Sequence, residues 1–132
     1  MVSRSIIAAL NDTLARHTGL ELAIVFGSVA GNAQGADSDV DLAVQAANPL
    51  DAELRMTLVA ELAVATGRAI DLIDLRTVGE PLLGQILVHG RRLLGSDEAY
   101  ARLLSRHLID AADFLPYAQR IVDERRRAWI GQ

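Results

Sequence analysis

Three aspartates stand close together between Asp37 and Asp41, where a new apolar segment begins. If this segment is a strand, Asp39 and Asp41 project from one face, while Val40 and Leu42 point from the other face into a core. Two carboxylates side by side on one strand repel each other, and a divalent cation removes that repulsion. Mg²⁺ prefers oxygen ligands and commonly takes a few carboxylates together with phosphate oxygens. Asp39 and Asp41 therefore indicate a metal site, although so short a motif also occurs in solvated loops.

Gly27 and Ser28 precede the aspartates and bear on this hypothesis, because they end the apolar run of residues 22–26. A glycine at the end of a buried strand lets the backbone turn sharply and lets a ligand approach closely. The hydroxyl and backbone N–H of Ser28, at the start of a helical turn, would bind a phosphate. An ordinary turn explains the dipeptide taken alone. Together with Asp39 and Asp41, it indicates phosphoryl or nucleotidyl transfer.

A third carboxylate would complete such a site, and the candidates are Asp71 and Asp74 in the apolar run of residues 68–75. They are three residues apart, so on a regular strand only one of them can face the site. Asp71 lies inside the run, where we expect it to be buried at a cost, whereas Asp74 is expected to meet solvent or a turn. We choose Asp71, as a general base that can also contact a metal. Asp39 and Asp41 would then hold one or two Mg²⁺ ions that bridge a triphosphate and steady the leaving pyrophosphate.

Strand and helix patterns alternate along the chain, which predicts an α/β domain of three layers or fewer. Asp51 is expected to cap one helix and Gly67 to close it, and Ser3 to cap the first. From Asp97 onward the pattern is helical, and Pro116 is expected to kink or divide that segment. The expected strands cover residues 22–26, 39–44, 68–75 and 91–95, and the expected shorter helices cover residues 3–17, 51–66 and 81–90.

Composition limits the function further. The 132 residues suit one domain, with a core over about residues 20–95 and a helical tail over about residues 97–129. A net charge of −4 does not favour binding to a phosphate backbone, and 4% aromatic residues argue against a surface that stacks bases. The absence of cysteine excludes disulfides and thiolate metal sites. The three histidines, His17, His89 and His107, lack metal-ligand spacing and are expected to be structural. The sequence shows neither a signal-peptide pattern nor a membrane span, so we expect a cytoplasmic protein.

The motif residues resemble those of the polymerase-β-like nucleotidyltransferases: Gly27-Ser28, ten intervening residues, Asp39-Val40-Asp41, and then a strand that carries Asp71. The short chain and its helical tail are most similar to the minimal nucleotidyltransferase (MNT) antitoxins of HEPN–MNT toxin–antitoxin pairs. The resemblance implies a small mixed β-sheet flanked by helices, with a C-terminal helical extension. One departure is Val29 to Asn32, where family members often carry an arginine or an aromatic residue.

The activity that the resemblance implies is Mg²⁺-dependent transfer of AMP from ATP to a hydroxyl, expected on a tyrosine of a HEPN ribonuclease partner. It assigns Gly27 and Ser28 to the nucleotide, and Asp39, Asp41 and Asp71 to metal and catalysis. Two alternatives stay open. One is a catalytically silent antitoxin that acts by binding alone, which the missing cation favours, and the other is a nucleotidyltransferase that modifies a small molecule.

Overall fold

A computed structural model of the chain describes residues 2–27 and 39–130, and its strands form one mixed sheet. The described strands are β1 (Leu20–Phe26), β2 (Val40–Ala46), β3 (Ile70–Asp74) and β4 (Arg91–Leu94), in the spatial order β3-β2-β1-β4. β1 runs antiparallel to both β2 and β4, whereas β3 runs parallel to β2. The predicted strands are therefore present, and the mixed sheet is confirmed.

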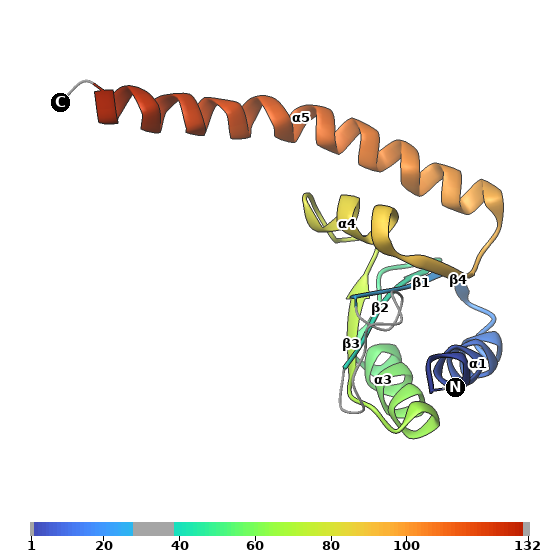
Figure 1. Cartoon of the computed structure of the whole chain (residues 1–132). Coiled ribbons are helices and arrows are strands. Elements are labelled where there is room, and N and C mark those ends of the chain that lie inside the picture. The colour runs from blue at the N-terminus through green and yellow to red at the C-terminus, as the bar shows by residue number, and fades with distance from the viewer. Residues whose placement is uncertain (1, 28–38, 131–132) are drawn as a thin grey trace.

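Helices cover both faces of this sheet, as Figure 1 shows. Helices α1 (Val2–Ala15) and α3 (Ala52–Thr66) lie side by side on one face. Helix α4 (Leu82–His89) and the start of α5 (Asp97–Ile130) lie on the other face. The rest of α5 extends well beyond the sheet and ends far from α1. The architecture is three-layered, with a C-terminal helical extension.

Two apolar cores separate these layers, and the strands divide their side chains between them. Alternation along β2 sends Val40, Leu42 and Val44 toward α1 and α3, whereas Ala43 contributes to the core under α4 and α5. Asp41 therefore lies on the α4 face of the sheet, with Ala43. The fully buried large side chains of the first core include Leu10, Leu14, Leu42, Leu58 and Leu62, and those of the second include Leu22, Ile24, Leu75, Leu83 and Ile86.

The predicted caps of α3 are confirmed. The side chain of Asp51 accepts a hydrogen bond of 2.7 Å from the backbone N–H of Leu54. Gly67 takes the left-handed conformation, with φ of 69°, and its N–H bonds to Ala63. The predicted cap of α1 is wrong, because the helix already begins at Val2 and Ser3 lies inside it.

The expected division at Pro116 is also wrong, because α5 is one helix from Asp97 to Ile130. Pro116 lies where α5 has left the sheet, and it is exposed, as is Ala112 one turn before it. The carbonyl of Ala112, which loses its N–H partner to the proline, can therefore bond to water. The helix continues past Pro116 with the gentle curve seen in Figure 1.

The first turns of α5 are held in place by polar contacts to the segment after β3 as well as by apolar contacts to the core. The Arg106 guanidinium donates hydrogen bonds to the backbone oxygens of Leu75, at 2.5 Å, and Val78, at 2.8 Å. Ala99 and Leu103 of the same helix are buried in the core beneath α4 and α5. No helix within the described residues is both long enough and apolar enough to cross a membrane.

Candidate active site

Asp41 and Asp71 lie opposite each other on the parallel strands β2 and β3. Phe26, the last residue of β1, is opposite Asp41 on its other side. Phe26 and Ile73 both pack into the core under α4, so alternation places Phe26, Asp41 and Asp71 on the same face of the sheet. The three residues form a row across three strands. We call it the carboxylate row, after Asp41 and Asp71.

The Asp41 carboxyl group is in an environment that disfavours its charge. Burial raises the pKa of Asp41, and the neighbouring Asp71 raises that pKa further by repulsion and by a hydrogen bond between the two carboxyl groups. The charge of Asp39 adds a smaller rise to the same pKa. A divalent cation would relieve this repulsion, so the donor set fits Mg²⁺.

Asp39 lies just before β2 and is exposed. It acts on Asp41 through its charge, but the described residues contain no group of three acidic or histidine side chains close enough to enclose an ion. Of the three predicted carboxylates, only those of Asp41 and Asp71 are in direct contact. Mg²⁺ usually keeps several waters and takes phosphate oxygens, so it does not need an all-protein cage.

Gly27 borders the carboxylate row directly. Its φ is 72°, and a Cβ at this position would overlap the Oδ2 of Asp41. The position therefore suits glycine for two independent reasons, its backbone conformation and its contact with the carboxylate. The other half of the predicted phosphate site, Ser28, lies outside the described residues, as do Asp37 and the departure at Val29 to Asn32.

Asp74 meets the turn after β3, as predicted, but it is buried there. Asp74 is 7% exposed, and its carboxylate accepts hydrogen bonds from the backbone N–H of Leu50, at 3.0 Å, and of Arg76, at 2.9 Å. Asp71 is exposed. The predicted burial of Asp71 is therefore wrong, and Asp74 is the buried carboxylate because the chain turns directly after β3 and covers it. An exposed carboxylate beside Asp41 is open to an incoming group.

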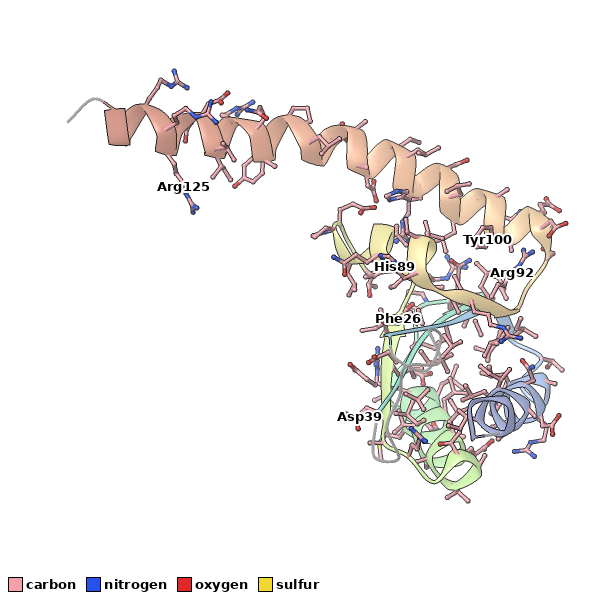
Figure 2. The ribbon with its side chains drawn as sticks, in the orientation of Figure 1. Phe26, Asp39, His89, Arg92, Tyr100 and Arg125 are labelled. Atoms are coloured by element: carbon pink, nitrogen blue, oxygen red, sulfur yellow. The ribbon has the colours of Figure 1, made fainter. Side chains whose placement is uncertain are left out.

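A cavity of about 370 Å³ adjoins this row on the side of α4, lined by Phe26, Gly27, Gln85 and His89. Figure 2 shows Phe26 beneath the end of α4 where His89 lies. Sequence reasoning missed Phe26 and Gln85, and it took His89 for a structural residue. Of these three residues, only Phe26 has a signal in the sequence, because it directly precedes the motif residue Gly27.

The other two histidines are structural, as expected. His17 lies 2.9 Å from Glu61, and His107 lies 2.5 Å from Glu80. A second polar cavity, near the opposite ends of the strands, is lined by Arg76, Arg102 and Arg106 among others. These arginines already bond to carboxylates or backbone oxygens. The carboxylate row is therefore the stronger candidate site.

The fold and the carboxylate row define a nucleotidyltransferase. The chain belongs to the polymerase β nucleotidyltransferase family, whose model matches residues 8–99. The protein adenylyltransferase MntA of Shewanella oneidensis is 37% identical over 99 residues, which cover 73% of this chain and 69% of that protein.

Solved structures extend the similarity to the helical tail. A toxin–antitoxin crystal structure with AMP-PNP contains a chain that matches 94% of this one over 98% of its own length, with 30% identity and a TM-score of 0.76. The complex of a tri-AMPylated HEPN toxin with an MNT antitoxin from Shewanella oneidensis matches with 28% identity and a TM-score of 0.70. That match covers 95% of this chain and 96% of the other.

Proposed function

We propose that this chain is the antitoxin of a toxin–antitoxin pair and that it transfers AMP from ATP to a tyrosine hydroxyl of a HEPN-type toxin, which it thereby silences. The observation that carries the proposal is the pairing of Asp41 with Asp71 beside Gly27, in a chain 37% identical to a protein adenylyltransferase. AMP-PNP, an analogue of ATP, is present in one of the similar toxin–antitoxin structures, which supports ATP as the substrate.

Asp71 is proposed as the general base. It is exposed on β3, which is the edge strand of the sheet, so an acceptor hydroxyl on a partner protein can reach it. The acceptor oxygen would form a bond to the α-phosphorus as the bond to pyrophosphate breaks, and Asp71 would take the hydroxyl proton. Gly27, together with Ser28, is proposed to bind the phosphates, and Gly27 adds no side chain between them and Asp41.

Asp39, Asp41 and Asp71 are the residues that would hold Mg²⁺. The bound ion would supply charge neutralisation for the triphosphate and for the departing pyrophosphate. Asp39 is exposed directly before β2, so its side chain could turn toward an ion held by the Asp41–Asp71 pair.

A complex with the toxin is part of the proposal, as in the similar structures of MntA with HepT. Helix α5 supports it, because its part beyond the sheet exposes several large apolar side chains, including Leu108, Leu115, Tyr117 and Val122. Such a surface is typical of a protein–protein interface. A cytoplasmic location follows from this proposal, because ATP and the toxin would be met there.

The test is to incubate the chain with ATP, Mg²⁺ and the HEPN protein encoded beside it, and to measure the mass of that protein. We expect a gain in mass of one or more AMP groups on tyrosine. The double substitution Asp39→Asn with Asp41→Asn should abolish it, whereas Asp12→Asn, at an exposed position of α1 on the other face of the sheet, should not. If the mass gain survives the double substitution, the assignment of the carboxylates is wrong.

Two other functions make different predictions in the same experiment. A silent antitoxin would protect cells from the toxin without any gain in the mass of the toxin. The wild-type chain and the double variant would then protect equally. A nucleotidyltransferase for small molecules would consume ATP without the toxin when given its acceptor, and would leave the toxin unmodified.

A further inference from the structure

We propose that the cavity lined by Phe26, Gly27, Gln85 and His89 receives the adenine base of ATP, and that the Gln85 amide selects adenine. The inference rests on the proposed function, since it names the nucleobase subsite of the same reaction. At about 370 Å³ the cavity is within the range usual for small-molecule sites.

The cavity shares a wall with the catalytic carboxylates. Phe26 is opposite Asp41 in the sheet, and Gly27 abuts the Oδ2 of Asp41. A nucleotide with its phosphates over Gly27 and Asp41 would therefore have this cavity within reach of its base. Figure 2 shows Phe26 and His89 on the same side of the sheet, beneath and at the end of α4.

The polar side chains of the cavity are available to a ligand. Neither Gln85 nor His89 makes a side-chain hydrogen bond to another described residue, whereas His17 and His107 each pair with a glutamate. Gln85 is exposed and lies one turn before His89 on α4. Among residues 2–27 and 39–130, the Gln85 amide and the His89 imidazole thus have no side-chain partner at the edge of a space that the Phe26 ring also borders.

Each of these groups has a recognised part in binding adenine. A glutamine amide can accept a hydrogen bond from the 6-amino group of adenine and donate one to a ring nitrogen. Aromatic rings such as those of Phe26 and His89 offer faces on which a base stacks. The combination provides both stacking and selection.

The position favours the base over the acceptor tyrosine. The cavity lies on the β1 side of Asp41, with Gly27, whereas Asp71 lies on the opposite side, in the edge strand β3. An acceptor that gives its proton to Asp71 approaches from the β3 side. The nucleotide base then occupies the β1 side.

The experiment measures equilibrium binding by titration calorimetry, without toxin. The ligands are ATP and the purine nucleoside triphosphate that lacks the 6-amino group, each with Mg²⁺. Gln85→Ala should weaken ATP binding roughly tenfold and bring the two ligands to similar affinities, because it removes the hydrogen bond to the amino group. Phe26→Leu and His89→Ala should weaken both ligands together, roughly tenfold, through lost stacking. Gln119→Ala, on the exposed part of α5, is the matched control.

The outcomes separate this inference from the proposed function. If Gln85→Ala and His89→Ala leave ATP affinity and the preference over the analogue unchanged, the inference is overturned. It is also overturned if Gln85→Ala raises only the KM for the toxin, which would assign the cavity to the acceptor. ATP binding with the expected preference, but no AMP transfer to the toxin, would uphold the subsite and overturn the function. No binding of ATP by the wild type would overturn both.

Discussion

Asp41 and Asp71 are paired residue for residue on adjacent parallel strands, so two carboxylates share one spot on the α4 face of the sheet. Burial and this neighbour both raise the pKa of Asp41. Like charges opposite each other in a sheet destabilise it, and nothing in a stable fold requires the pair. The arrangement therefore costs stability near neutral pH, which a bound cation or protonation of Asp41 would restore, and this leads to the first two predictions.

Asp41→Asn is expected to increase the free energy of unfolding at pH 7, in the absence of metal, by about 0.5 kcal/mol, the scale of a like-charge pair in a sheet. The pKa of Asp41 is raised in the folded state above its ordinary value of 3.8. Protonated Asp41 therefore contributes fully to the stability of the fold below pH 3.8, and this contribution is lost as the pH rises through the folded-state pKa. The gain should therefore shrink as the pH falls toward that range. Urea unfolding at several pH values measures it, with Asp113→Asn as the control, and a loss of stability at pH 7 would contradict the prediction.

Mg²⁺ is expected to raise the melting temperature of the wild-type chain in the absence of nucleotide. A ligand at ten times its Kd stabilises the folded state by about 1.4 kcal/mol. Asp41→Asn or Asp71→Asn should remove most of this shift, and Asp113→Asn should keep it. Thermal unfolding followed by circular dichroism over a Mg²⁺ series measures the effect. Equal shifts in all four proteins would place the ion elsewhere.

Gly27→Ala and Gly67→Ala form a matched pair, because both glycines have a positive φ, of 72° and 69°. Each alanine should cost about 1–2 kcal/mol of backbone strain. A Cβ at Gly67 meets no atom within 4 Å, whereas one at Gly27 overlaps Asp41. Gly27→Ala should therefore also displace the carboxylate and lower AMP transfer about 100-fold, as a 1 Å misplacement does. Kinetics and urea unfolding of both variants test this, and equal losses of activity would contradict it.

The sequence predicted best those parts of the fold that local chemistry determines. Helix α3 begins and ends where Asp51 and Gly67 place it, because a capping carboxylate and a left-handed glycine act within one turn of the chain. Alternation along β2 correctly sent Val40 and Leu42 into the core. The sequence could not decide between a kink and a division at Pro116, because the outcome depends on whether the surrounding helix is packed or exposed, and the division is the alternative that is wrong.

Features of the site that depend on distant residues were beyond the sequence. The burial of Asp74 comes from the turn after β3 and from the backbone of Leu50, which is remote in the chain. Gln85 and His89 reach the cavity only because α4 folds back over the end of β1. No local pattern marks either residue.

His107→Ala is expected to destabilise the fold by about 1–3 kcal/mol, since it leaves a buried carboxylate without its partner. The Glu80 side chain is only 7% exposed, and its other oxygen accepts a bond from the N–H of Gly84. Arg102→Ala breaks an exposed pair with Glu98 and should cost less than about 0.5 kcal/mol. Chemical unfolding of both variants gives the comparison. Similar small losses would mean that the Glu80 pair contributes no more than a surface pair.

Arg106→Ala is expected to loosen α5 from the sheet, because its guanidinium is the donor to the backbone oxygens of Leu75 and Val78. Hydrogen bonds from charged groups contribute about 1.5–3 kcal/mol each, so the loss should be of that order after water replaces part of it. Arg106→Lys should recover only part of the stability. The lysine keeps the positive charge, but one ammonium group cannot reach both oxygens as the planar guanidinium does. Arg120→Ala, farther along the exposed part of α5, should have little effect.

Amide hydrogen exchange measures the loosening of α5 directly. In Arg106→Ala it should become faster in the turns around Leu103. Unchanged exchange there would mean that the apolar contacts of Ala99 and Leu103 hold the helix without the arginine.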